Sequence, residues 1–103
     1  MDDLTLREAQ KQVDESIQSL GGYWPPLANL ARLFEECGEV ARVVNQLHGS
    51  KRRKPGEHEP DAAGELGDTL YVLIALANSL GIDLGASLRA VIEKYDRRDG
   101  PTP

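Results

Sequence analysis

The sequence predicts an all-α protein built as a four-helix bundle. Four segments repeat apolar residues at spacings of three and four, which is the pattern of an amphipathic helix. No segment alternates apolar and polar residues as a half-buried strand does. Glycines, prolines and short polar stretches separate the four segments.

The first helix is predicted from a capping box at residues 5–8 (TLRE), in which a threonine and a glutamate satisfy free backbone amides. Its apolar stripe consists of Leu6, Ala9, Val13, Ile17 and Leu20, and Gly21-Gly22 ends it. The stiff turn at residues 23–26 (YWPP) leads into the second helix. That helix is predicted from Pro26, a residue favoured at the first helical position, to Leu47.

The third helix is predicted from Pro60 to Leu80, with Gly81 just beyond it. From Thr69 onward it is apolar almost all the way round, which places it at a bundle centre or a subunit interface. The fourth helix is capped by Asp83 and has an apolar stripe of Leu84, Leu88, Val91, Ile92 and Tyr95. Helices two and three are expected to form the antiparallel centre of the bundle.

Length and charge limit the possible functions. A chain of 103 residues corresponds to one domain, predicted at residues 1–98 and followed by a flexible tail at residues 99–103. The net charge of −5 argues against binding to nucleic acid or to acidic membranes. No secretory signal and no run of about 20 apolar residues is present, so we expect no membrane partner and a cytoplasmic location. The single cysteine, Cys37, is interpreted as a small apolar residue on a packed face.

Three glutamates lie among the apolar residues of the second helix, in the sequence EECGEV at residues 35–40. At about 100° per residue, Glu36 shares a column with Val40, Val43 and Leu47, so it faces the predicted core. Glu39 lies about 60° away, at the border of the polar face, and is close enough along the helix to converge with Glu36. We expect the neighbouring apolar residues in the core: Leu30, Leu33, Phe34, Val40, Val43 and Val44.

The third helix repeats this arrangement with Glu65 and Asp68, also three residues apart. Glu65 shares its column with Val72 and Leu76 and therefore also faces inward. If the two helices pack antiparallel, the four carboxylates meet, and four such charges without partners would be severely unfavourable. Divalent cations resolve this repulsion, and an all-oxygen donor set suits Mg²⁺, or Mn²⁺ in its place.

These carboxylates have two other interpretations. A di-iron site needs Glu-x-x-His motifs, but His48 follows Asn45 at that spacing and His58 lies in a loop. A solvated face is the common reason for a single Glu-x-x-Glu pair. Two pairs on separate helices, each with one member in an apolar column, favour a metal site over a solvated face.

The residues at 35–40 (EECGEV) and 65–68 (ELGD), before a long apolar helix, resemble the MazG-type all-α nucleoside triphosphate pyrophosphohydrolases, whose signature is E-E-x-x-E followed by E-x-x-D. The resemblance runs from residue 23 to residue 99 and is strongest to the short, single-domain, YpjD-like bacterial members. It implies Mg²⁺-dependent hydrolysis of an NTP or dNTP at the α–β bond, giving a monophosphate and pyrophosphate, as nucleotide-pool housekeeping. It also implies a MazG-like bundle assembled as a homodimer or a dimer of dimers (a homotetramer).

The resemblance also implies residue roles. Glu36, Glu39, Glu65 and Asp68 correspond to the metal ligands, and Glu35 and Glu36 to the catalytic carboxylates, with Glu35 as an outer ligand or a water-orienting group. Relatives often carry Lys-x-Asn near the end of the fourth helix, where this chain has Lys94-Tyr95-Asp96. The acidic Asp96 favours the alternative of a non-catalytic metal-binding and nucleotide-binding bundle of the same fold. A purely structural bundle that mediates association is a third possibility.

Four further residues are candidates for binding substrate. Lys54 ends a run of four cations that would close on the triphosphate, although a solvated loop between helices is the simpler explanation of the run. Trp24 would stack on a base or plug the end of the bundle. Lys94 and Arg98 near the end of the fourth helix would contact phosphate. Asn78, in the apolar helix, would bond to a neighbouring helix or face the nucleotide.

Overall fold

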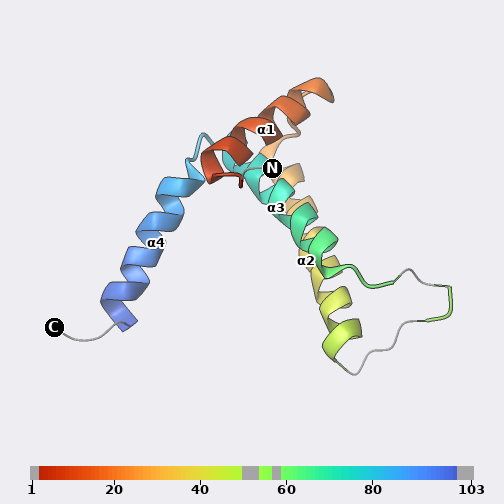
Figure 1. The fold of residues 1–103 in the computed structure, drawn as a ribbon. Coiled ribbons are helices and arrows are strands. Elements are labelled where there is room, and N and C mark those ends of the chain that lie inside the picture. Colours follow the sequence, from red (N-terminus) through yellow and green to blue (C-terminus); the bar gives the residue numbers. More distant parts are fainter. Residues whose placement is uncertain (1–2, 50–53, 57–58, 100–103) are drawn as a thin grey trace.

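The computed structural model describes residues 3–49, 54–56 and 59–99, and these residues contain four helices and no strand. The helices are α1 (Leu6–Ser19), α2 (Pro26–His48), α3 (Ala62–Ser79) and α4 (Leu84–Asp99). Figure 1 shows α2 and α3 side by side and antiparallel, with α1 across the end of α3 and α4 pointing away. The predicted all-α class and the antiparallel centre are confirmed.

The ends of the helices follow from local hydrogen bonds. The capping box of α1 is present, with the Glu8 amide donating to Thr5 Oγ1 at 3.1 Å and the Thr5 amide donating to Glu8 Oε1 at 3.2 Å. Asp83 caps α4 as predicted, since its Oδ1 accepts from the Ala86 amide at 3.2 Å. Helix α3 begins at Ala62, two residues later than expected, because Asp61 is its N-cap and accepts from the Gly64 amide at 2.9 Å.

The core lies where α1 crosses α3. Val13 and Ile17 of α1 pack against Ile74 and Ala75 of α3. Helix α2 contributes Val43, which is 2% exposed, as the sequence predicted. This small core fixes the second half of α3, which follows Glu65 and Asp68 in the chain.

The expectation that Leu30, Phe34 and Val44 lie in the core was wrong, and Leu30 is 38% exposed. Phe34 is 71% exposed and Val44 is 45% exposed, because α2 is covered by α3 on only one side. Cys37, interpreted as a packed residue, is also exposed. Together with Leu27 and Leu30 these residues form a stripe along α2 at helical spacing. We call this stripe the α2 apolar face.

Helix α4 leaves the other three helices at a sharp corner. Gly81 has a φ of 68°, in the left-handed region that glycine adopts at low cost, and α4 then runs at 105° to α3. The apolar stripe of α4 is consequently exposed at Leu88, Val91, Ile92 and Tyr95. Helix α4 extends through Asp99, and the rest of the predicted tail lies outside the described residues. In the described part of the chain no single helix is long and apolar enough to cross a membrane, and only the bent pair of α3 and α4 passes that test, by length and composition.

Gln10 ties this corner to α1. Its Nε2 donates to Asn78 Oδ1 at 2.9 Å and to the Ile82 carbonyl at 2.8 Å, and its Oε1 accepts from the Leu84 amide at 3.0 Å. Asn78 in turn donates to the Gln10 carbonyl at 3.0 Å. Asn78 therefore bonds to a neighbouring helix, the first of the two roles that the sequence left open.

Replacing Gln10 by alanine is expected to lower the free energy of unfolding by about 2 kcal/mol, because three hydrogen bonds are lost and Asn78 loses a partner. Chemical denaturation measures this change. Gln12→Ala, at an exposed position of the same helix, is the matched control. Equal stability of the two variants would contradict the role given to Gln10.

Candidate functional site

The structure brings three of the four predicted carboxylates together. Glu36 of α2 and Glu65 and Asp68 of α3 each offer one oxygen atom, and these atoms all lie within 4.8 Å of one another. Glu36 and Glu65 are partly buried, whereas Asp68 is exposed. We call these residues the carboxylate cluster. It lies between the two central helices, where the sequence predicted a meeting of carboxylates.

Helical register explains the cluster. Glu36 lies seven residues before the buried Val43, and Glu65 lies seven residues before the buried Val72, so both carboxylates face the α2–α3 contact. Asp68 follows Glu65 by three residues and therefore lies on the next turn of the same face. The Thr69 hydroxyl donates to the Glu65 backbone carbonyl at 2.8 Å, so it is bonded within its own helix.

The electrostatics of the cluster make it costly without a cation. Partial burial raises the pKa of Glu65 above its ordinary value of 4.5, and the negative charges of Glu39, Asp68 and Glu36 raise it further. The positive charge of Arg42 partly opposes this rise in the pKa of Glu65, and Arg32 Nε lies 4.0 Å from Glu36 Oε1. At that length the ion pair offsets little of the repulsion.

The donor set fits a hard divalent cation. Three carboxylates supply oxygen only, and the partial burial of two of them gives the site a defined geometry. Mg²⁺ binds through a few carboxylates while keeping water or substrate oxygens as its other ligands. The open side at Asp68 leaves room for such ligands. The residues therefore fit the metal that the resemblance implied, and Mn²⁺ equally well.

Metal-free stability is expected to depend on pH through Glu65. Because its folded-state pKa is raised, the stabilisation from neutral Glu65 is complete below about pH 4.5 and is lost as the pH rises through the folded-state pKa. Glu65→Gln keeps a neutral side chain, so its stability advantage over the wild type should grow from about pH 4.5 to neutral pH. Denaturant titrations in the presence of a chelator measure this difference. A difference that is constant with pH would contradict the repulsion.

Glu39 and Glu35 stand outside the carboxylate cluster. Glu39 accepts from Arg42 at 2.8 Å, in an ion pair along the same helix. It is still near enough to raise the pKa of Glu65. Glu35 is exposed and lies one residue before Glu36. The metal-binding role of Glu39 and the catalytic role of Glu35 stay predictions.

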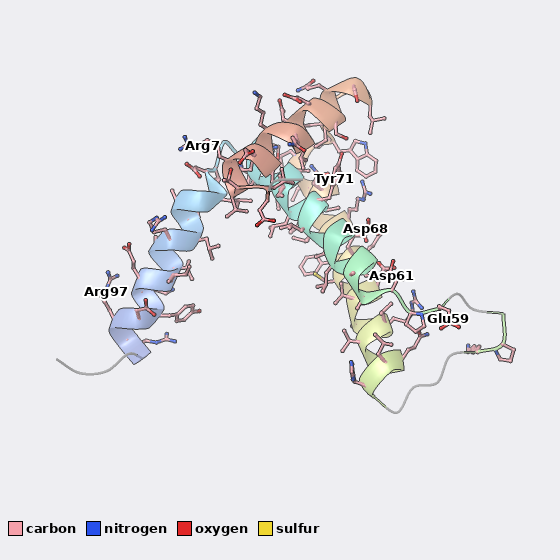
Figure 2. All side chains as sticks on the ribbon, in the orientation of Figure 1. Arg7, Glu59, Asp61, Asp68, Tyr71 and Arg97 are labelled. Atoms are coloured by element: carbon pink, nitrogen blue, oxygen red, sulfur yellow. The ribbon has the colours of Figure 1, made fainter. Side chains whose placement is uncertain are left out.

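A cavity of about 470 Å³ opens beside the cluster. Asp68 belongs to both, and the cavity is lined by Trp24, Asn29 and Arg32 as well as by Tyr71 of α3. Figure 2 shows Asp68 and Tyr71 on neighbouring turns of α3. Trp24, a predicted substrate-binding residue, therefore lies in the wall of a cavity that reaches the carboxylates.

Arg32 and Asn29 also line this cavity, although neither was predicted from the sequence as a site residue. Arg32 lies four residues before Glu36, the spacing of a helical ion pair, and its guanidinium lies 5.5 Å from the centre of the Trp24 ring. Asn29 lies seven residues before Glu36 and so occupies the same inward column. A polar residue in that column was the signal that could have identified it.

The structure does not bring the other predicted substrate-binding residues to the cluster within one chain. Lys94 and Arg98 lie on α4, with their charged ends 5.2 and 4.8 Å from the Tyr95 ring. Figure 2 shows α4, marked by Arg97, well apart from Asp68. Lys54 is exposed, and the three cations before it lie outside the described residues, as does His58.

The fold and the site define an all-α protein that gathers carboxylates between two antiparallel helices, next to an open cavity. Residues 25–101 match the family MazG, described as the MazG nucleotide pyrophosphohydrolase domain. Two Bacillus subtilis proteins are similar along most of their length. Uncharacterised protein YpjD is 45% identical over 96% of this chain and 90% of its own, and uncharacterised protein YvdC is 29% identical over 92% and 96%.

Two solved structures are similar as well. The crystal structure of the proposed pyrophosphatase YpjD from Bacillus subtilis superposes with a TM-score of 0.82 at 43% identity, over 93% of this chain and 99% of that one. The Bacillus-conserved MazG protein, a nucleotide pyrophosphohydrolase, superposes with a TM-score of 0.81 at 43% identity, over 96% and 97%. The chain belongs to the MazG nucleotide pyrophosphohydrolase family. It is a hydrolase that acts on pyrophosphate bonds.

Proposed function

We propose that this protein hydrolyses a nucleoside triphosphate, NTP or dNTP, at the α–β bond with Mg²⁺ as cofactor, and so removes surplus or unwanted nucleotides. The observation that carries the proposal is the carboxylate cluster, in which three oxygen donors from two helices lie within 4.8 Å of one another. The matched family model and one similar solved structure carry the description nucleotide pyrophosphohydrolase. The products would be a nucleoside monophosphate and pyrophosphate.

We assign a separate role in this reaction to each residue of the site. Glu36, Glu65 and Asp68 would hold Mg²⁺, with Glu39 reaching it after release from Arg42. Bound divalent cations neutralise phosphate charge and activate water for attack. Glu35, exposed beside Glu36, would orient the attacking water and accept its proton. Arg32, next to Glu36 and Trp24, would be the cation nearest to the bound phosphates.

The experiment that tests the proposal incubates the protein with a panel of NTPs and dNTPs in Mg²⁺, in Mn²⁺ and with a chelator. The expected products are the monophosphate and pyrophosphate, formed only when a metal is present. Release of orthophosphate with a diphosphate would contradict the assigned bond. Binding of nucleotide in calorimetry without turnover would favour the non-catalytic bundle.

Self-association is part of the proposal. The α2 apolar face is exposed, and so is a second stripe on α3 made of Leu66, Leu70 and Leu73. Helix α1 packs against Ile74 and Ala75 of α3, and the leucines of the second stripe lie on a different side of α3 at helical spacing. Exposed apolar stripes of this kind are typical of an interface. A second copy of the chain would cover them, giving a homodimer or a homotetramer.

The same assembly would allow α4 to contribute to the site of another copy. Its apolar stripe is exposed, and α4, which carries Lys94 and Arg98, points away from α2 and α3 of its own chain (Figure 1). Their predicted contact with the phosphates therefore requires the cluster of another copy. This is the physical reason for proposing that the site is completed by association.

Phe34→Glu is expected to weaken self-association at least tenfold, because a charge would be buried at the centre of the α2 apolar face. Sedimentation velocity over a range of protein concentrations measures this. Gln12→Glu, which adds the same charge at an exposed site of α1, is the control and should keep the wild-type assembly. A wild-type protein that stays monomeric at every concentration would refute the proposed interface.

A further inference from the structure

The cavity beside the carboxylate cluster has the form of a site for a flat ligand. It measures about 470 Å³ and is walled by Trp24, Tyr23 and Tyr71, with Val72 and Ala75 at its apolar base. Cavities of this size that combine aromatic walls with a few polar groups are typical small-molecule sites. Among the described residues that line it, Asp68 is the one acidic residue, and it also belongs to the carboxylate cluster, so a ligand in the cavity would lie next to the cluster.

Most polar groups of the cavity wall already have partners. The Tyr23 hydroxyl donates to Asp14 at 2.5 Å, and burial together with this bond raises the pKa of Tyr23, so it stays protonated. The Tyr71 hydroxyl is bonded to the Ser16 hydroxyl at 2.9 Å. Arg32 lies over the Trp24 ring and beside Glu36. The hydroxyls of Tyr23 and Tyr71 are thus bonded within the protein, and Arg32 is the cation that the proposed function places next to the phosphates.

Asn29 is the exception. It is 6% exposed, which makes it the one buried polar residue among the described positions. Its backbone amide bonds to the Pro25 carbonyl at 3.2 Å, but its side-chain amide has no hydrogen bond to any described residue. The polar atoms of this amide are not among the fully buried side-chain atoms that lack a partner, so they stay accessible from the cavity, where water or a ligand can bond them. Its position in the cavity wall means that a ligand can supply the missing partners.

We infer that this cavity receives the nucleobase of the substrate and that the Asn29 amide binds the hydrogen-bonding edge of that base. The inference rests on the proposed function, and it adds a residue that determines base specificity. Aromatic side chains stack on any base, so Trp24 and Tyr71 would bind bases without distinguishing them. An amide offers a donor and an acceptor side by side, which matches a base edge that carries an acceptor next to a donor. Which atoms of the base face the amide donor and the amide acceptor then decides which bases bind well.

The test changes the hydrogen-bonding pattern of residue 29 while keeping its shape. Asn29→Asp offers acceptors only, so it should favour guanine, whose N1–H and N2–H₂ donors are adjacent, over uracil, whose single N3–H lies between two carbonyls. We expect the ratio of kcat/KM for GTP to that for UTP to rise roughly tenfold relative to the wild type. Asn29→Ala removes both donor and acceptor and should bring the kcat/KM values of the different bases closer together.

Thermal melting of both variants shows whether they fold, and Gln12→Glu is the control, for which the wild-type ratio is expected. If Asn29→Asp does not fold, Asn29→Ala still decides the matter. Base ratios that equal those of the wild type in every folded variant would overturn the inference.

A binding measurement separates this inference from the proposed function. Trp24 is the only tryptophan of the chain and lines the cavity, so its fluorescence reports occupation without turnover or metal. Guanosine and uridine should quench Trp24 emission in the wild type, and Asn29→Asp should shift their relative affinity toward guanosine. Quenching without hydrolysis of any nucleotide would refute the proposed function and leave the base site intact. Hydrolysis with no quenching and unchanged base ratios would refute the base site alone.

Discussion

Glu36→Gln is expected to lower kcat/KM for nucleotide hydrolysis by roughly three orders of magnitude, which corresponds to about 4 kcal/mol of transition-state stabilisation. The substitution keeps the size of the side chain but replaces a charged oxygen pair by a neutral amide. Glu36 is the member of the carboxylate cluster that α2 supplies, and its side chain is only 19% exposed, so no neighbouring water takes over its place easily. Loss of its charge should weaken metal binding more than folding.

Steady-state kinetics at saturating Mg²⁺ measures the effect. Glu15→Gln on the exposed surface of α1 is the matched control and should retain wild-type kinetics. Activity of Glu36→Gln within tenfold of the wild type would remove Glu36 from the site and would leave the cluster without a contribution from α2.

Magnesium is expected to raise the free energy of unfolding of the wild type by about 2.7 kcal/mol at a concentration 100 times its dissociation constant. The reason is that the cation binds the folded arrangement of the cluster and cannot bind the unfolded chain as well. Thermal or chemical unfolding with Mg²⁺ and with a chelator measures the difference. Glu65→Gln should be at least as stable as the wild type in chelator and should gain little from Mg²⁺.

Glu39→Ala distinguishes the three-carboxylate cluster from the four-ligand site that the family resemblance implied. Glu39 is paired with Arg42 and lies outside the cluster, so its loss should reduce the Mg²⁺-dependent gain without abolishing it. An unchanged gain in Glu39→Ala would remove Glu39 from the metal site. A wild type whose stability is the same with and without Mg²⁺ would contradict metal binding altogether.

Periodicity was sufficient for the helices because each one is defined by local signals. The capping box at Thr5 and Glu8 and the cap at Asp83 are bonds between residues three apart, so the chain's own order determines them. The start of α3 was misplaced by two residues because Pro60 and Asp61 are both favourable helix-start residues, and only the Asp61–Gly64 hydrogen bond decides between them.

The carboxylate site was accessible to the same reasoning, but only in part. Glu36 and Glu65 occupy inward columns of their helices and Asp68 lies one turn from Glu65, so an antiparallel pair brings the three together. Phe34 showed the limit of that reasoning. Its apolar character does not reveal whether its own chain or another molecule covers it, and in the single chain it is exposed.

The sequence by itself determined the helices, the direction in which their carboxylates point and the family to which the chain belongs, because periodicity, capping and short motifs act between residues near in the chain. The tertiary structure alone decided which side chains share a space. It joined Trp24, Asn29 and Arg32 to Asp68 in one cavity, bonded Asn78 to Gln10 and turned α4 away from the other helices. These outcomes depend on the angles at which helices cross and on contacts between residues far apart in sequence. A pattern along one helix contains no information about either.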